Sequence, residues 1–226
     1  MQKKRKLVIL GDSAFAEVAY ECFTHDSEYE VVGFSVESAH LKHDTLFGLP
    51  VVPFETIDEH FKPGDVEFYA ALVYSQLNRL RTRLYRAAKT KGYRPASYVS
   101  TRAFVWHNVQ LGEHCFIFED NTVQPFVRLG DNVVLWSGNH IGHHSAVEDH
   151  CFIASHVVVS GFCTVGNSSF LGVNAALANN ITIGADNWIG PGVTITSDTE
   201  PGQLFKGEQP APSKVGTKRF FKLKED

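Results

Sequence analysis

The chain has 226 residues, of which 43% are hydrophobic and 20% charged, with a formal net charge of −4. No apolar run approaches the roughly 18 residues that cross a bilayer, and the apolar stretch at residues 7–10 is too short for a signal-peptide core. The acidic balance argues against a nucleic-acid partner, and we expect a cytoplasmic protein.

Residues 1–98 alternate strand-like and helix-like segments, which is typical of a small parallel sheet covered by helices. The first strand ends at Gly11, and a helix is expected over residues 14–23. Strands are predicted over the aliphatic runs at 6–12, 29–36, 49–53 and 66–72.

A second long helix is predicted between an N-cap at Ser75 and a stop at Gly92. Leucine and alanine recur on one face at intervals of three and four. We expect the opposite, basic face to be solvated, with contact to an acidic partner or phosphate as the alternative. That face carries Arg79, Arg83, Arg86 and Lys89.

From residue 105 the sequence repeats every six residues. Positions six apart from 105 to 195 hold only Val, Leu or Ile, and this unbroken series predicts a parallel β-helix. Three hexads close one triangular coil of 18 residues, so that about five coils fit. Stacked coils lie about 4.8 Å apart, and residues 18 apart therefore become neighbours.

Two other positions of the hexad have their own character. The third residue after each aliphatic is most often Asn, Asp, His or Gly, and these types tolerate the left-handed backbone of a tight corner. The fourth is mostly small, and it includes three of the four cysteines. We expect these cysteines to be reduced, buried residues, because no C-x-x-C pair indicates a disulfide or zinc framework.

The hexads also single out one of the eleven histidines. His143 lies one place before the corner position, and Gly161 follows one coil later. An imidazole beside an exposed glycine N–H suits acyl transfer, because the ring accepts a proton while the amide stabilises the oxyanion. The histidines at the corner position itself (114, 144, 150 and 156) are expected to be structural.

The segment SGNHIGHHSAVEDHCFIASHVVVSGF at 137–162 resembles the two-domain left-handed β-helix sugar acyltransferases. The later FLGVNA and WIGPGV segments, and Gly207, Pro210 and Ala211 in the tail, fit the same pattern. This group contains the bacillosamine-pathway and perosamine N-acetyltransferases and the sialic acid O-acetyltransferases.

The resemblance implies a mixed fold: a small α/β, Rossmann-like parallel-sheet domain at 1–98, which binds the acceptor, and a left-handed parallel β-helix of about five coils at 99–199. A C-terminal tail follows at 200–226. It also implies a homotrimer with active sites between subunits and acetyl-CoA as co-substrate, with no metal and no membrane insertion.

The implied activity is acetylation of the amino group of a nucleotide-linked amino sugar, in surface-polysaccharide or glycan precursor synthesis such as lipopolysaccharide biosynthesis. His143 is then the general base, and Gly161 donates its N–H to the thioester oxygen. Further positions expected to bind acetyl-CoA are Gly172, Gly190 and Lys214. Positions expected to bind the acceptor are Gly11, Asp12, Ser13, Glu37 and Tyr74.

The chain departs from the family pattern at three places. One follows the second strand, where relatives often show paired aspartates and this chain has Ser35, Val36 and Glu37. His144 stands where relatives carry an acidic residue or an amide, so the group that orients His143 is open; Glu148, Asp149 or a neighbouring subunit are the alternatives. The turn at residues 11–16 lacks two glycines and a histidine of the usual G-x-x-G-H-G phosphate loop, which leaves the nucleotide open.

Three other functions remain as alternatives. One is sugar O-acetylation of the sialic acid type. Another is a zinc enzyme similar to the γ-class carbonic anhydrases, and the third is a non-catalytic β-helix scaffold. The histidines that keep the zinc alternative open are His140, His144, His150 and His156.

Overall fold

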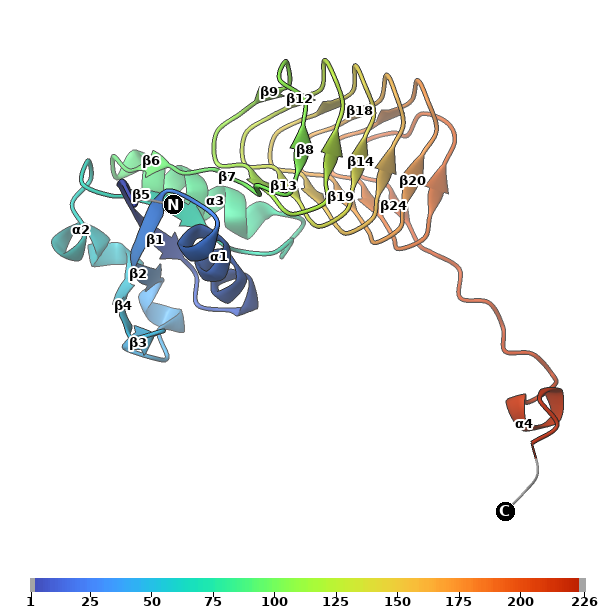
Figure 1. Cartoon of the computed structure of the whole chain (residues 1–226), viewed down its shortest axis with the longest axis horizontal. Helices are drawn as coiled ribbons and strands as arrows, with labels where there is room; N and C mark the ends of the chain where they lie inside the picture. Colours follow the sequence, from blue (N-terminus) through green and yellow to red (C-terminus); the bar gives the residue numbers. More distant parts are fainter. Residues whose placement is uncertain (1–2, 224–226) are drawn as a thin grey trace.

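The computed structural model describes residues 3–223, which form an α/β domain, a β-helix and an extended tail (Figure 1). The sheet of the first domain has the strand order β3-β4-β2-β1-β5-β6, and only β3 runs antiparallel to its neighbour. The strands are β1 (Arg5–Leu10), β2 (Tyr29–Val36), β3 (Thr45–Leu46), β4 (Leu49–Pro53), β5 (Glu67–Ala70) and β6 (Arg94–Pro95). The helices are α1 (Ala14–His25), α2 (Ile57–His60) and α3 (Arg79–Thr90), with short 3₁₀ turns at Ser38–His40 and Phe54–Thr56.

Helices cover both faces of this sheet. Alternate residues of β1 point to opposite faces, and each set packs against different helices. Leu7 and Ile9 pack in the cluster that contains α1, whereas Val8 and Leu10 pack with residues of α2 and α3. The predicted small parallel sheet covered by helices is confirmed.

The start of α3 differs from the prediction. Ser75 is not its N-cap: the helix begins at Arg79, after Gln76, Leu77 and Asn78 with φ angles of 51°, 49° and 65°. A left-handed backbone costs a non-glycine residue about 1–2 kcal/mol. The buried side chain of Asn78 holds this turn on the β-helix, since its Nδ2 donates to the carbonyls of residues 168 and 169 at 3.1 and 3.3 Å.

The β-helix has three parallel faces of short stacked strands. The first face contains β7 (Tyr98–Val99), β10 (Phe116–Ile117), β13 (Val134–Leu135), β16 (Phe152–Ile153), β19 (Phe170–Leu171), β22 (Trp188–Ile189) and β24 (Leu204–Phe205). The second contains β8 (Phe104–Val105), β11 (Thr122–Val123), β14 (His140–Ile141), β17 (Val158–Val159), β20 (Ala176–Leu177) and β23 (Thr194–Ile195). The third contains β9 (Gln110–Leu111), β12 (Arg128–Leu129), β15 (Ala146–Val147), β18 (Thr164–Val165) and β21 (Thr182–Ile183).

We number each corner after the face that precedes it. Residues 18 apart pair in register along each face, for example Ile117 with Leu135. The aliphatic column fills the interior, although Leu111 in the first coil is exposed. Left-handed backbone recurs every six residues from His114 to Gly192, so the predicted corner position is confirmed. The left-handed β-helix predicted from the sequence is the observed architecture.

The β-helix continues beyond the predicted boundary at residue 199. β24 pairs with β22 in parallel, Trp188 opposite Leu204, at a spacing of 16 residues instead of 18. The hexad period therefore ends before the coil does. Beyond residue 205 the chain leaves the β-helix as an extended tail with one short helix, α4 (Thr217–Phe220) (Figure 1).

The two domains share a buried interface. Phe15 and Phe23 of α1 pack on Phe116 of the first face, with ring centroids 5.4 and 5.7 Å apart. α3 lies along the third corner, where Arg81 is 0% exposed. Its Nε donates to Oδ1 of Asn132 at 3.0 Å, and its other nitrogens donate to the carbonyls of residues 72, 132, 150 and 151.

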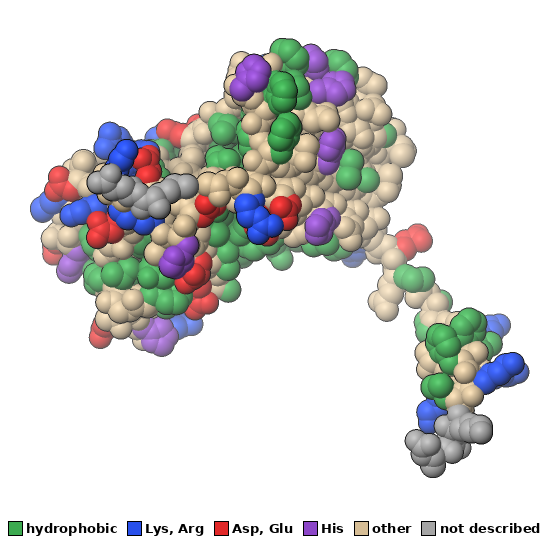
Figure 2. Space-filling model, viewed as in Figure 1, with side chains coloured by type: hydrophobic (Ala, Val, Ile, Leu, Met, Phe, Trp, Pro, Cys, Tyr) green, Lys and Arg blue, Asp and Glu red, His purple; other side chains and the backbone are tan. Residues whose placement is uncertain are grey.

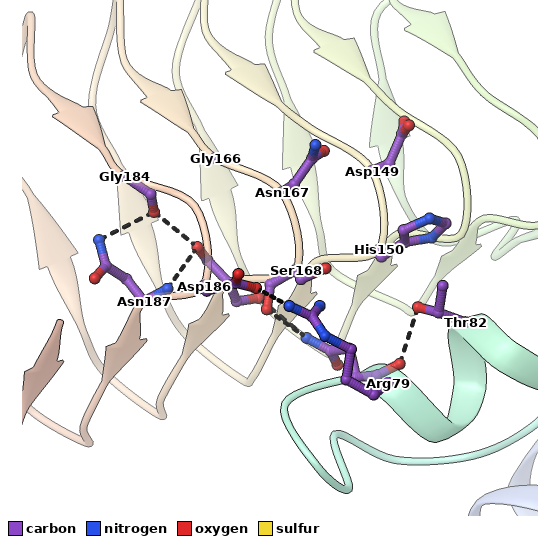
Figure 3. A network of polar contacts seen from close by, with 12 residues as sticks. Arg79, Thr82, Asp149, His150, Gly166, Asn167, Ser168, Gly184, Asp186 and Asn187 are labelled. Carbon is purple, nitrogen blue, oxygen red and sulfur yellow. Dashed lines mark hydrogen bonds and ion pairs between the residues drawn. The ribbon is translucent and has the colours of Figure 1, made fainter. Parts of the chain in front are cut away.

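The basic face of α3 is not simply solvated, as the sequence had led us to expect. Arg79 pairs with Asp186 on the β-helix (Figure 3), and Lys89 pairs with Glu113. Arg83 pairs with the carboxylate that follows β2. All three carboxylates belong to the same chain, and two of them lie at the third corner of the β-helix, along which α3 runs. The basic face of α3 therefore forms intramolecular ion pairs.

Within residues 3–223, no helix combines the length and the apolar character needed to cross a membrane.

Candidate functional site

The second corner brings the predicted base and the predicted amide together. His143 lies between β14 and β15, and its backbone N–H donates to Oε1 of Gln124 at 2.9 Å. A Cβ on Gly161, one coil further, would lie 3.0 Å from both Cε1 and Nε2 of His143. The missing side chain at residue 161 therefore makes room for the edge of the imidazole.

The two ring nitrogens of His143 have different surroundings. Its Nδ1 lies 3.1 Å from Nδ1 of His144. Within residues 3–223, its Nε2 has no hydrogen-bond partner, and the side chain is exposed. Nε2 is thus the nitrogen that is available to accept a proton above Gly161.

The N–H of Gly161 is not exposed, which corrects the expectation from the sequence. It is buried and donates to Oδ1 of Asn179 at 3.1 Å. Asn179 occupies the equivalent position one coil later, so its short amide reaches back to the preceding coil. Its side chain lies at the surface. A carbonyl oxygen that binds this amide therefore has to take the place of Asn179 Oδ1.

Four predicted acceptor residues line one cavity of about 240 Å³ in the first domain: Gly11, Asp12, Ser13 and Glu37. The cavity lies at the carboxyl ends of β1 and β2 and at the N-terminus of α1, where open α/β sheets bind ligands. Gly11 has a φ of +118°, which favours glycine. The remaining walls are mainly apolar, formed by Leu10, Val36, Phe54, Leu72, Leu80 and Leu84.

Two polar side chains in this cavity differ in their hydrogen bonding. The carboxylate of Glu37 accepts two hydrogen bonds from Arg83 at 2.7 and 2.8 Å, and these bonds lower its pKa. Ser35, which the sequence analysis did not assign to the site, is 1% exposed, and its Oγ has no partner among the described residues. A buried hydroxyl without a partner is costly, so Ser35 is suited to bind a polar ligand group.

Tyr74 does not join these four residues. It packs on the first face of the β-helix against Phe170, with ring centroids 4.4 Å apart. There it lines a separate cavity of about 300 Å³, whose walls include Trp136 and Trp188.

The predicted acetyl-CoA residues beyond Gly161 also lie elsewhere. Gly172 and Gly190 are at the first corner, where their N–H groups donate to the carbonyls of residues 189 and 205. A Cβ on either would come within 2.8 Å of the next layer of backbone. Lys214 lies in the exposed tail. One chain alone therefore does not bring these three residues to Gly161.

The histidines of the zinc alternative are spread over the β-helix. His140 lies on the second face and His144 at the second corner, whereas His150 is buried at the third corner and His156 lies at the first. Within residues 3–223, no group of three His, Cys, Asp or Glu side chains is arranged to hold a metal ion.

The cysteines fit their predicted structural role. Cys115, Cys151 and Cys163 are buried free thiols in the β-helix core. Burial raises the pKa of Cys115 and Cys151 to about 12, so that neither provides a ready thiolate.

Comparison with known proteins finds solved structures that share this two-domain fold. Residues 126–161 match the family described as bacterial transferase hexapeptide (six repeats). The acetyltransferase domain of PglB from Neisseria gonorrhoeae FA1090 superposes with a TM-score of 0.81 at 21% identity, over 90% of this chain and 97% of that domain. PerB from Caulobacter crescentus, in complex with CoA and GDP-perosamine, gives a TM-score of 0.79 at 24% identity, over 89% and 94%. The chain shares the fold of these structures, a small α/β domain followed by a left-handed β-helix.

The resemblance predicted from the sequence is thereby confirmed for the fold of both domains. The PglB domain was also solved in complex with acetyl coenzyme A. Among curated proteins, the bifunctional protein GlmU from Xanthomonas axonopodis pv. citri (strain 306) is 32% identical over 36% of this chain and 24% of GlmU. The match therefore spans about a quarter of the length of that relative.

Proposed function

We propose that this chain is an acetyl-CoA-dependent acyltransferase that acetylates the amino group of a nucleotide-linked amino sugar. The observation that carries the proposal is the position of His143 Nε2, which is unpartnered among the described residues and lies over Gly161. The shared fold adds support, because the PglB domain binds acetyl coenzyme A and PerB binds CoA and GDP-perosamine.

The proposed reaction is a direct transfer. The amine nitrogen of the sugar attacks the thioester carbonyl carbon, and His143 Nε2 removes a proton from that nitrogen as the C–N bond forms. The carbonyl oxygen accepts the N–H of Gly161 after the amide of Asn179 has turned away. The C–S bond then breaks, and the coenzyme A thiolate takes the proton from the His143 imidazolium.

The cavity beside Gly11 is the proposed site for the nucleotide of the acceptor. Its apolar walls suit a planar base, and the N-terminus of α1 attracts the phosphates. The unpartnered hydroxyl of Ser35 supplies a specific polar contact. Glu37 is neutralised by Arg83, so its carboxylate repels the phosphates less than a free one would.

We also propose that the enzyme is a homotrimer whose active sites lie between subunits. The acetyl-CoA residues on the first and second corners meet only if a second copy supplies one of the two corners. Exposed aromatic side chains beside the second corner give such a copy an apolar surface, namely Phe104, Trp106, Phe126 and Phe162. Figure 2 shows histidine and hydrophobic side chains gathered on one edge of the β-helix. Light scattering that returns the mass of a single chain would contradict this assembly.

The deciding experiment is to incubate the protein with acetyl-CoA and a panel of UDP-, GDP- and dTDP-linked amino sugars, and to follow acceptor-dependent thiol release. One of these sugars should be acetylated at nitrogen, and His143→Ala should lower its turnover by at least about a hundredfold with an unchanged fold. His107→Ala is the matched control, because His107 occupies the same column two coils away and is also exposed. Absence of acceptor-dependent release, or near-normal turnover of His143→Ala, refutes the proposal.

A further inference from the structure

His143 is held next to a second histidine instead of a carboxylate. The Nδ1 atoms of His143 and His144 are 3.1 Å apart, and the two rings are nearly perpendicular at 88°. At this distance one nitrogen has to donate a proton and the other has to accept it. Two Nδ1–H groups facing each other would repel.

The ring of His144 is fixed by its neighbours in the corner column. It stacks between Phe126 and Phe162, 18 residues before and after it, with centroid distances of 4.6 and 4.8 Å. The ring of Phe162 also lies edge-on to His143 at 5.1 Å. These aromatic contacts hold the plane of the His144 ring, and in that plane its Nδ1 faces Nδ1 of His143.

The carboxylates considered from the sequence are engaged elsewhere. Oε2 of Glu148 accepts the backbone N–H of residue 167, and Oδ1 of Asp149 accepts that of residue 131. Both side chains belong to the third corner. Within residues 3–223, His144 is therefore the side chain that meets His143 Nδ1.

We propose that His144 is a positioning residue that accepts a hydrogen bond from Nδ1–H of His143 and thereby keeps the lone pair of His143 on Nε2, above Gly161. This inference rests on the proposed acyl transfer, in which Nε2 takes the proton. After that transfer, the imidazolium still donates through Nδ1–H to Nδ1 of His144. The pair thus sets the tautomer of the base without a carboxylate.

The chain itself offers matched variants. His144→Phe removes the acceptor nitrogen and extends the Phe126–Phe162 stack, and phenylalanine already adopts the same left-handed backbone at both flanking positions. His144→Asn removes the ring but keeps an acceptor, since Oδ1 of asparagine has the same bonded position as Nδ1 of histidine. Asparagine also occupies this corner position at residues 132, 174 and 180.

Turnover gives the first readout. His144→Phe should lower kcat about tenfold or more and leave KM for acetyl-CoA unchanged, because a misplaced proton affects the base and not the binding groove. His144→Asn should recover most of the lost kcat. A purely structural role predicts the opposite order, because the phenylalanine variant keeps the stack. That opposite order, or equal kcat values in both variants, would overturn the proposal.

Nitrogen-15 NMR of histidine-labelled protein gives a readout that needs no activity. The signals of His143 are assigned by their loss in His143→Ala. Wild type and His144→Asn should show the Nδ1–H tautomer at His143, and His144→Phe should shift it toward Nε2–H. An Nε2–H tautomer in wild type, or an unchanged tautomer in His144→Phe, contradicts the role of His144. If wild type transfers no acetyl group, the proposed function fails while this measurement still decides the hydrogen bond.

Discussion

Two corners of the β-helix carry histidine at the same position of the hexad and use it in different ways. His114 at the third corner and His144 at the second have φ angles of 58° and 59°. His114 is 0% exposed beneath the first domain, whereas His144 lies at the surface between two exposed phenylalanines. The hexad position therefore sets the backbone, and the element that covers the corner sets the chemistry.

Hydrogen bonding explains the difference. Nε2 of His114 accepts the N–H of Ala70 at 2.8 Å, and its Nδ1 donates to Oδ1 of Asn132 at 2.9 Å. Both nitrogens are thus occupied, in a neutral ring that packs on Tyr69. At the second corner, no hydrogen bond among residues 3–223 joins the histidines to the first domain or engages Nε2 of His143. The covered corner joins the two domains, and the open corner is the one where we propose that the reaction takes place.

The largest difference between the corners should appear when Arg81 is removed from the covered one. Arg81→Ala leaves the acceptors of a fully buried guanidinium unpaired and opens a cavity, so the free energy of unfolding should fall by at least about 3 kcal/mol. Urea unfolding measures this change. Arg79→Ala, on the same helix, breaks an exposed ion pair and should cost less than about 1 kcal/mol.

Equal losses in these two variants would contradict the assignment of Arg81 as the interdomain contact. If Arg81→Ala does not fold, Arg81→Lys gives a milder test, because it keeps the charge and loses several donors. It should still be less stable than Arg79→Lys.

At the open corner, Gly161→Ala should affect catalysis more than stability. The atoms nearest to the added Cβ belong to the exposed His143 ring, which can move aside. Moving the base should lower kcat about tenfold, with an unfolding midpoint close to that of wild type. Gly142→Ala is the contrasting variant, since its Cβ would lie 2.6 Å from backbone and should destabilise the coil. Unchanged kcat in Gly161→Ala would remove the geometric basis for pairing His143 with Gly161.

Local sequence patterns were enough to predict most features of the β-helix. The hexad period predicted the interior column, the left-handed corners and the meeting of His143 with Gly161, because each depends only on a fixed spacing of 18. Contacts between distant segments were beyond it. The hydrogen bond from the N–H of Gly161 to Asn179 could not be predicted, because it depends on the direction of the Asn179 side chain. The left-handed turn before α3 could not be predicted either, because it depends on the contact of Asn78 with the β-helix.

The burial of Arg81 could have been predicted from its position in the sequence. Arg81 lies three residues before Leu84 and seven before Ala88, and thus on the apolar face of α3. A charged residue at an apolar position indicates a buried polar contact, here the carbonyls of the third corner. β24 was missed for a different reason, since its spacing of 16 breaks the period on which the prediction relied.

The covered corner should also make stability depend on pH through His114. Burial lowers the pKa of His114 to about 3, because the charged ring would lose its hydration. Protonation would also place a hydrogen on Nε2 facing the N–H of Ala70. In the unfolded chain its pKa is about 6.5, so below that pH the unfolded state binds a proton that the folded state refuses. The stability that the neutral His114 provides is therefore present above about pH 6.5 and is lost as the pH falls below that value. The loss from this residue should be about 1.3 kcal/mol between pH 7 and pH 5.5.

The measurement is urea unfolding at both pH values for wild type and His114→Asn. Asparagine accepts the left-handed backbone and does not titrate, so the variant should be less stable at pH 7 but should lose about 1.3 kcal/mol less on acidification. Taking the difference cancels the contribution of other groups, including His150, whose pKa burial also lowers. Equal losses in the two proteins would mean that His114 is protonated alike in the folded and unfolded chains. The contrast between covered and open corners would then rest on geometry alone.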